Sequence, residues 1–242
     1  MNLVIDVGNT FIKLAVFEGK RLVEVMRVDR EELLKALKNI FEKFPEIRDA
    51  LVSSVGKLSG AELKAIAVFC PFQELTPKSK VPFINRYGTP ETLGMDRVAL
   101  ITAAYYNYKL QNCLVIDAGT CITYDFINKE TEYLGGAISP GVRMRFKAMH
   151  EFTHKLPMIE DHNFNNIIGD STKSSMISGV VHGTVKEIEG FIADYKVIYK
   201  DLTVILTGGD SHFLSKRLKS TIFAHSNFLL EGLNYILELN KR

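Results

Sequence analysis

Two short segments of the chain each end an apolar run with an aspartate that is followed, two residues later, by a glycine. LVIDVGNT runs from Leu3 to Thr10, and LVIDAGTC runs from Leu114 to Cys121. Small turn residues leave backbone N–H groups free to face an anion, and a carboxylate at a strand end can hold a hydrated cation. One Asp-x-Gly corner is typical of an ordinary hairpin turn, but a facing pair indicates a site that grips a polyphosphate from two sides.

Three further features could contribute to such a site. Lys13 follows Thr10 by three positions and could reach a bound phosphate. ILTGGD, from Ile205 to Asp210, follows an apolar run, and its glycines would let a flat ring approach the backbone. GMDR, from Gly94 to Arg97, offers a carboxylate and a guanidinium, although an acidic residue in the first turn of a helix is also favourable for the helix dipole alone.

The two aspartate corners are related by a constant offset of 111 residues (114 − 3), which matches Asp6 with Asp117 and Gly8 with Gly119. Self-similarity at a fixed offset indicates repeated structure. The sequence therefore predicts two similarly folded halves.

The first half alternates strand and helix patterns. Strand patterns at residues 3–7, 11–18 and 21–28 are separated by turn signals and predict a meander. Asp29 and Glu32 have the spacing of a capping box, and apolar residues then recur at helical spacing until Pro45. A strand at 50–55, a helix from about Ser59 to Phe69 and a strand at 72–76 give the order β-β-β-α-β-α-β.

The second half repeats this order. Strands are predicted at 113–117, at 120–127 and around 133–138, followed by a helix after Pro140 and a long helix from about Ser171 to Tyr199. A strand at 202–207, a short helix, a strand at 221–224 and a last helix from Ser226 complete it. The helix of MDRVALITAAYYNY ends just before the seam, so the predicted domains are residues 1–112 and 113–242.

Composition and charge indicate a globular protein that acts on small molecules. The 242 residues are 46% hydrophobic and 24% charged, and the formal net charge is +2 without a dense Lys/Arg block. Neither nucleic acid nor a membrane is therefore expected as a partner. The start does not resemble a signal peptide, and three cysteines without Cys-x-x-Cys spacing favour a reducing cytoplasm. His150 and His154 lack a carboxylate partner between them and are expected to be a solvated pair.

The doubled element order with its three glycine corners resembles the actin, hexokinase and Hsp70 ATPase superfamily. Five motifs in order are similar, more closely, to the type III pantothenate kinases: DVGNT (Asp6–Thr10), GMDR (Gly94–Arg97), DAGT (Asp117–Thr120), GGAISPG (Gly135–Gly141) and STKSSMISG (Ser171–Gly179). This resemblance implies an α/β fold of two ribonuclease-H-like domains, each a mixed five-stranded sheet flanked by helices, with an ATP cleft between them.

The resemblance also assigns roles to individual residues. It implies that ATP is bound by Asp6, Val7, Gly8, Asn9, Thr10, Phe11, Ile12, Lys13 and Thr120. Asp6 would serve Mg²⁺ directly or through water, and Asp117 would hold the monovalent cation, K⁺ or NH₄⁺. Asp96 would be the general base. Pantothenate would be bound by Tyr87, Gly94, Met95, Asp96, Arg97 and Thr172. The family works as a homodimer.

Structural roles for some of these residues stay open. Tyr87 could be ordinary packing, Thr172 could cap free amides at a helix start, and GGAISPG could be a tight turn into the following helix. These alternatives concern single residues and leave the order of the five motifs unexplained.

The implied activity is ATP-dependent phosphorylation of pantothenate to 4'-phosphopantothenate, the first step of coenzyme A biosynthesis. One alternative is a nucleotide-binding regulatory protein that has kept the fold and lost turnover, but a regulator could lose Asp6, Asp96 or Asp117 without penalty, and all three are present. A kinase for another small hydroxyl substrate would explain the phosphate corners but not GMDR together with STKSSMISG.

Overall fold

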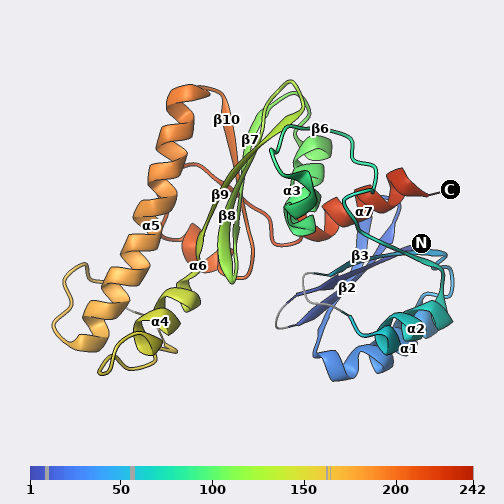
Figure 1. Ribbon diagram of the computed structural model, residues 1–242, viewed down its shortest axis with the longest axis horizontal. Helices are drawn as coiled ribbons and strands as arrows, with labels where there is room; N and C mark the ends of the chain where they lie inside the picture. Colours follow the sequence, from blue (N-terminus) through green and yellow to red (C-terminus); the bar gives the residue numbers. More distant parts are fainter. Residues whose placement is uncertain (9–10, 55–57, 162, 164, 242) are drawn as a thin grey trace. The chain divides into compact units, whose positions relative to one another are not determined.

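The computed structural model describes residues 1–8, 11–54, 58–161, 163 and 165–241 (Figure 1). The chain forms two compact units. Unit 1 comprises Met1–Lys109, Thr131–Tyr133 and Asn227–Arg242, and unit 2 comprises Leu110–Glu130 and Leu134–Ser226. No helix in the described part of the chain is long and apolar enough to cross a membrane.

Unit 1 is built on a five-stranded sheet. Its strands are β1 (Asn2–Val7), β2 (Ile12–Glu18), β3 (Arg21–Val28), β4 (Asp49–Ser54) and β5 (Phe72–Glu74), in the spatial order β3-β2-β1-β4-β5. The first three strands pair antiparallel as a meander, while β4 joins β1 in parallel and β5 joins β4 in parallel. The strands that return in parallel need crossover connections, which the helices supply.

Helices cover both faces of this sheet. Its helices are α1 (Leu33–Lys43), α2 (Gly60–Phe69), α3 (Met95–Asn107) and α7 (Phe228–Asn240), and 3₁₀ turns η1 (Arg30–Glu32) and η2 (Pro90–Thr92) precede α1 and α3. One face buries alternate residues of β1, including Leu3 and Ile5, in a core cluster that also contains Leu37 of α1 and Ile66 of α2. The other face, which carries Asp6 by the same alternation, packs against α7 and α3.

Unit 2 repeats the topology. Its strands are β7 (Asn112–Ala118), β8 (Cys121–Ile127), β9 (Glu132–Pro140), β10 (Leu202–Thr207) and β11 (Phe223–Ala224), and the first two residues of β9 are counted with unit 1. Its helices are α4 (Val142–Glu151), α5 (Thr172–Ile198) and α6 (Ser211–Ser215). The order β9-β8-β7-β10-β11 corresponds strand for strand to β3-β2-β1-β4-β5. In both units the second strand is antiparallel to the first and the fourth is parallel to it. The long helix α5 lies along one face of this sheet (Figure 1).

The predicted fold class is therefore confirmed, with one addition. A short strand β6 (Ile84–Asn85) pairs in parallel with Glu132 and Tyr133, the first residues of β9, and makes the second sheet six-stranded instead of five-stranded. The sequence shows no strand-length apolar pattern at 84–85, because this strand is only two residues long.

Two further details differ from the sequence-based expectations. The capping box expected at Asp29 and Glu32 is wrong: Asp29 makes no side-chain cap, and the 3₁₀ turn instead directs the Glu32 N–H to the backbone carbonyl of Asp29. Such a box forms at Ser59 and Glu62, at the start of α2. The last helix, α7, packs in unit 1 rather than with the second half; the division after residue 112, which describes the repeat, stays a prediction.

Close backbone contact between α3 and α7 generates a stability prediction. A Cβ at Gly232 of α7 would lie 1.9 Å from the carbonyl oxygen of Ala99 in α3, so Gly232→Ala must push the two helices apart. We expect a loss of about 1–3 kcal/mol in the free energy of unfolding, measured by urea denaturation.

Gly190→Ala is the matched control, because a Cβ at Gly190 of α5 would meet nothing within 4 Å. It should stabilise by about 0.5–1 kcal/mol through helix propensity. Equal effects of the two substitutions would contradict the proposed helix contact.

Candidate active site

Asp6 is the buried carboxylate at the end of β1. It is 6% exposed, stands opposite Lys13 of β2 in the register, and lies beside Ser53 of the parallel strand β4. Burial raises the pKa of Asp6 to about 6; the Lys13 charge opposes the shift, and the carboxylate of Asp96 adds to it. A buried carboxylate next to another carboxylate is an unfavourable arrangement in the empty protein, and it is typical of a site that receives a cation.

Asp96 lies in the first turn of α3, where the helix dipole favours a negative charge. Its Oδ1 accepts a hydrogen bond from the backbone N–H of Arg97, with 2.8 Å between the two atoms. A Cβ at Gly94 would lie 2.4 Å from this oxygen, so the glycine leaves the space that the carboxylate occupies. Gly94 has an ordinary φ of −58°. The reason for glycine at this position is therefore side-chain space and not backbone strain.

Arg97 is buried and is placed by two tyrosines. Its guanidinium lies 5.3 Å from the ring centroid of Tyr87, and Nη1 points to the Tyr87 hydroxyl at 3.4 Å. Tyr87 in turn stacks on the fully buried Tyr133 of β9, with 6.0 Å between the ring centroids. Tyr133, near the start of β9, thus supports Tyr87 and Arg97, which were predicted to bind the substrate.

The turn after Asp6 is closed by a backbone hydrogen bond from the Gly8 N–H to the carbonyl oxygen of Phe11, at 3.1 Å. Val7 and Ile12 are buried beneath it, and the Phe11 ring is covered by the Arg27 guanidinium at 3.6 Å. Asn9 and Thr10, which were also predicted to bind ATP, lie outside the described residues.

In unit 2, three segments meet at the Asp117 corner. Asp117 ends β7 beside Thr207 of the parallel strand β10, and the Gly119 N–H bonds to the Cys121 carbonyl to close the turn. Gly208 has φ +93°, and a Cβ there would lie 2.3 Å from Oδ1 of Asp117, so this glycine satisfies both a left-handed backbone and a close approach. The Thr-Gly-Gly segment is therefore part of the Asp117 corner.

GGAISPG reaches the same corner through its last glycine. The Gly141 N–H donates to the carbonyl oxygen of Thr120 at 3.0 Å, and a Cβ at Gly141 would lie 2.1 Å from the Gly119 oxygen. Thr120 itself is exposed at the tip of the turn. Thr120 is thus an exposed residue on a turn that Gly141 contacts closely.

Thr172 stands apart from these contacts. It is the first residue of α5 and is exposed, next to a capping box in which Ser171 and Ser174 satisfy the free amides. The capping role belongs to Ser171, so Thr172 is not the capping residue that the sequence left open.

The oxygen atoms at each aspartate corner fit a cation that completes its coordination with phosphate oxygens or water. No group of three or more His, Cys, Asp or Glu side chains in the described part of the chain could hold a metal on its own. Mg²⁺ is commonly bound by one or two carboxylates together with substrate phosphates and water. Ser53 Oγ beside Asp6 and Thr123 Oγ1 opposite Asp117 are buried and have no hydrogen-bond partner among the described residues. Each corner therefore offers an aspartate and an unsatisfied hydroxyl.

Ser53 and Thr207 were not among the residues singled out from the sequence. The signal was present, since the carboxyl ends of parallel strands meet at one edge of a sheet. The run ALVSSV carries two serines just before its last residue, and LTVILT ends in a threonine. Ser53 and Thr207 could be identified only once the structure showed that β4 pairs with β1 and that β10 pairs with β7.

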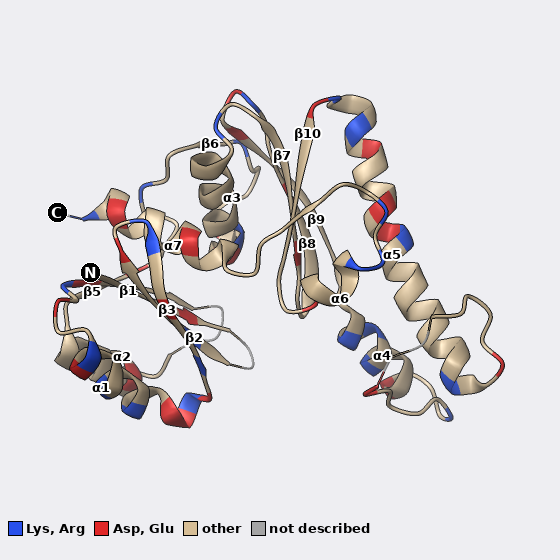
Figure 2. Cartoon of the chain, turned by 180° about the vertical axis from the view of Figure 1, so that it is seen from behind, with Lys and Arg blue, Asp and Glu red and all other residues tan. Residues whose placement is uncertain are grey.

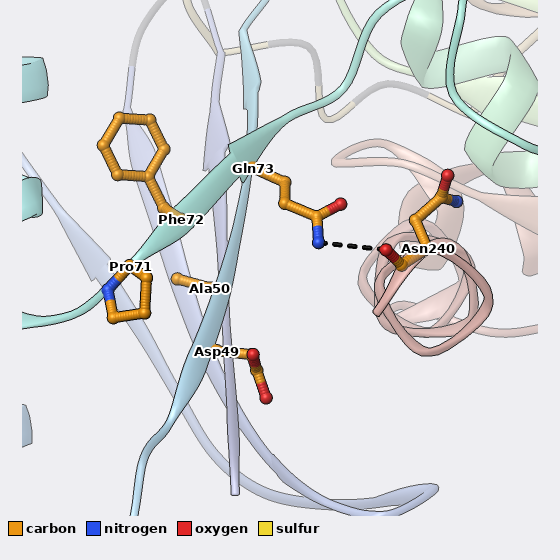
Figure 3. Close-up of a pocket in the computed structure, with 6 residues that line it drawn as sticks. All are labelled: Asp49, Ala50, Pro71, Phe72, Gln73 and Asn240. Carbon is orange, nitrogen blue, oxygen red and sulfur yellow. Dashed lines mark hydrogen bonds between the residues drawn. The ribbon is translucent and has the colours of Figure 1, made fainter. Parts of the chain in front are cut away.

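A cavity of about 490 Å³ lies at the opposite end of the first sheet. It is lined by Asp49, Ala50, Pro71, Phe72, Gln73 and Asn240 (Figure 3). Asp49 begins β4, whereas Asp6 faces the end of that strand. Gln73 Nε2 donates to the backbone oxygen of Asn240 at 3.1 Å, and Lys241 pairs with Asp49. No predicted site residue lines this cavity, and its polar groups satisfy one another.

Comparison with known proteins decides the family. The family model for type III pantothenate kinase matches residues 2–194. A type III pantothenate kinase from Christiangramia forsetii is 50% identical over 241 residues, which is 100% of this chain and 99% of the relative. The chain belongs to the type III pantothenate kinase family. A second member, from Flavobacterium johnsoniae, is 48% identical and covers 97% of this chain and 96% of its own.

Solved structures are similar in fold alone. A Campylobacter jejuni protein named after the Baf family of transcriptional activators has a TM-score of 0.66 at 22% identity, covering 98% of each chain. A glucokinase from an Antarctic psychrotroph has a TM-score of 0.54 at 12% identity, also covering 98% of each chain. These likenesses agree with the actin-like ATPase fold of the family.

The raised pKa of Asp6 predicts a pH-dependent stability difference. Between pH 3.8 and about 6 the folded chain holds a proton that the unfolded chain releases, so stability falls as the pH rises through this window. A shift of about 2 units corresponds to roughly 3 kcal/mol. Asp6→Asn should therefore be more stable than wild type by up to roughly 3 kcal/mol at about pH 7.5, and the gain should vanish near pH 4.

Urea unfolding of both proteins across this range, without metal or nucleotide, measures the difference. Asp49→Asn is the control, since Asp49 is on the same face at the far end of β4. A difference between wild type and Asp6→Asn that does not change with pH would contradict the assignment of the raised pKa to Asp6.

Proposed function

We propose that this protein transfers the γ-phosphoryl group of ATP to the hydroxyl of pantothenate, giving 4'-phosphopantothenate and ADP at the first step of coenzyme A biosynthesis. The observation that carries the proposal is the family match along the whole chain at up to 50% identity. The local geometry of unit 1 supports it, because a buried Asp6 and an Asp96 at a helix start lie close enough for their charges to interact.

Asp96 is the proposed general base. In phosphoryl transfer the protein mainly positions the reactants and neutralises developing charge. The hydroxyl oxygen of pantothenate forms a bond to Pγ while the bond from Pγ to the bridging oxygen breaks, and the hydroxyl proton passes to the Asp96 carboxylate. The space beside Gly94 and the Arg97 N–H hold that carboxylate in one place.

ATP binding is assigned to the two turns. In unit 1 the proposed residues are Asp6, Val7, Gly8, Asn9, Thr10, Phe11, Ile12 and Lys13, and in unit 2 the proposed residue is Thr120. The turn N–H groups and hydroxyls suit phosphate oxygens, and Lys13 adds a positive charge next to Asp6.

Pantothenate binding is assigned to Tyr87, Gly94, Met95, Asp96, Arg97 and Thr172. Pantothenate carries a carboxylate at the end remote from its reactive hydroxyl. The Arg97 guanidinium, held by the Tyr87 ring and hydroxyl, is suited to pair with that carboxylate or with a phosphate oxygen.

Cations complete the proposed site. Asp6 with Ser53 would hold Mg²⁺ that arrives with ATP, directly or through water, and Asp117 with its surrounding oxygens would hold K⁺ or NH₄⁺. Both ions supply positive charge that offsets the phosphate charge. We further propose that the protein is a cytoplasmic homodimer, as the family resemblance implies.

A coupled assay of the purified protein with pantothenate, ATP and Mg²⁺, with and without K⁺, tests the activity. Phosphopantothenate should form and be identified by mass spectrometry. If none forms under any of these conditions, the regulatory alternative replaces the kinase assignment.

Asp96→Asn should lower kcat by at least about 100-fold while ATP binding persists, because removal of a general base typically costs this much. Gly94→Ala should also lower kcat, by about 10-fold or more, since its Cβ displaces the same carboxylate. Gly60→Ala, at the start of α2 where a Cβ meets nothing within 4 Å, is the matched control. Near wild-type kcat in Asp96→Asn at saturating substrates would exclude Asp96 as the base.

The two aspartate corners should respond to different ions. Asp117→Asn is expected to weaken activation by K⁺ or NH₄⁺ more than it weakens Mg²⁺ dependence, and Asp6→Asn should do the reverse, because a monovalent ion lacks the tightly held water shell of Mg²⁺. Initial rates are measured while each ion is titrated. Identical shifts in both variants, or a wild-type enzyme indifferent to K⁺, NH₄⁺ and Na⁺ alike, would refute this division.

A further inference from the structure

One carboxylate on α5 gathers hydrogen bonds from three other elements of unit 2. Glu187 Oε1 accepts from the Tyr124 hydroxyl of β8 at 2.9 Å and from the Ser139 hydroxyl of β9. Its other oxygen, Oε2, accepts from Nη2 of Arg145 in α4 at 2.5 Å. We call these four residues the Glu187 cluster. Ser139 belongs to the GGAISPG motif, whereas Tyr124, Arg145 and Glu187 were not singled out from the sequence, and none of the four is assigned a role in the proposed reaction.

The cluster is largely shielded from water and charged. The side chains of Arg145 and Glu187 are 21% and 24% exposed, and Tyr124 is fully buried. Burial opposes the charge of Glu187, but the hydrogen bonds from Arg145, Ser139 and Tyr124 outweigh it and hold its pKa below the ordinary value. Burial and the neighbouring Glu187 raise the pKa of Tyr124, which keeps its hydroxyl as a donor. These bonds are therefore charge-assisted at neutral pH.

The cluster is connected to the predicted phosphate turn by one short segment. Arg145 also donates from Nε to the carbonyl oxygen of Pro140 at 2.8 Å. The next residue, Gly141, bonds to the Thr120 oxygen and is in tight contact with the Gly119 oxygen. The segment Ser139–Gly141 is thus held by the Glu187 cluster on one side and pressed against the Gly119–Thr120 turn on the other.

Packing alone does not account for this arrangement. The helix α5 is already attached to the sheet through apolar contacts, such as Ile188 and Ile192 in the core and the Phe191 ring stacked on Tyr124 at 4.1 Å. A shielded ion pair is a weak source of stability compared with apolar side chains of similar size. The cluster instead fixes the position of the segment, because the Arg145 guanidinium donates to both Glu187 and the Pro140 carbonyl, while Glu187 accepts from three side chains.

We propose that Glu187 is a positioning residue for the nucleotide. It fixes Arg145 and Ser139, which hold Ser139–Gly141 against the Gly119–Thr120 turn, so that Thr120 at the tip of the turn stays in position for the ATP phosphates. The inference rests on the proposed function only in taking ATP as the ligand of this turn.

The same helix provides a matched control. Glu189 also accepts three hydrogen bonds, from Lys219 N, Ser220 N and Ser220 Oγ, and these likewise hold its pKa below the ordinary value against burial. Its partners, Lys219 and Ser220, lie in the segment after α6, and among the described residues neither makes a hydrogen bond to the Asp117 corner. Charged residues of both signs follow one another along this part of α5 (Figure 2), so removing either carboxylate changes the local charge to a similar extent.

The experiment compares Glu187→Gln with Glu189→Gln. Glutamine keeps the shape and can still accept from Tyr124 and Ser139, but it loses the charge that holds Arg145. We expect Glu187→Gln to weaken ATP–Mg²⁺ binding about 10-fold by calorimetry and to raise KM for ATP by a similar factor, with KM for pantothenate unchanged. Glu189→Gln should leave both affinities unchanged. Arg145→Lys, which retains the charge but cannot donate from Nε to Pro140, should behave like Glu187→Gln.

The outcomes separate the two proposals. The binding measurement uses no pantothenate, so a wild-type protein that binds ATP without phosphorylating pantothenate would refute the kinase assignment and still test the role of Glu187. Equal ATP affinity in Glu187→Gln, Arg145→Lys and Glu189→Gln would overturn the positioning role. A second outcome would also overturn it: Glu187→Gln loses ATP affinity, but its KM for pantothenate rises by the same factor and its Tm falls. That pattern indicates a general loss of structure.

Discussion

Parallel pairing of the first and fourth strands of each sheet is the constraint on which both candidate corners depend. It aligns Asp6 with Ser53 in unit 1 and Asp117 with Thr207 in unit 2. In each case the antiparallel second strand adds a residue opposite the aspartate, Lys13 in one unit and Thr123 in the other. The chain therefore places a carboxylate and a neighbouring hydroxyl at the same edge of a sheet twice, using one topology.

The two copies differ in what surrounds the carboxylate. Asp6 is buried, with a lysine opposite it and a second carboxylate nearby, and its pKa is raised accordingly. Asp117 is half-buried and lies against Gly208, which has a positive φ, with Thr207 and Thr123 beside it in the sheet register. Neutral threonine hydroxyls beside a carboxylate suit a weakly hydrated monovalent cation, whereas a buried acid beside a predicted phosphate-binding turn suits a divalent one. The two aspartate corners thus share a backbone topology but differ in the side chains that surround the carboxylate.

Several features of the site increase free energy in the empty protein. A buried Asp6, an unsatisfied Ser53 hydroxyl and glycines that lie against neighbouring atoms all cost stability or leave no room for a side chain. The rest of each unit supplies apolar packing that offsets these costs, with alternate residues of β1 against α1 and α2 in unit 1 and those of β7 against α5 in unit 2. Binding of the proposed nucleotide and cations would offset these costs, which links the geometry of the site to its proposed ligands.

The sequence by itself determined the repeated order of strands and helices, the positions of the aspartate corners and the family. These follow from local periodicity, turn residues and motif order, which depend on residues that are close together in the sequence. It did not determine the hydroxyl beside Asp6, the approach of Asp96 to Asp6, the space that Gly94 leaves, or the Glu187 cluster. The capping box at Asp29 was wrong because a backbone hydrogen bond took the place of the side chain. Strand pairing and helix packing join residues that are tens to more than a hundred positions apart, as in the contact of α7 with α3 and β1. Only the tertiary structure could decide which of the many polar residues in the chain become neighbours.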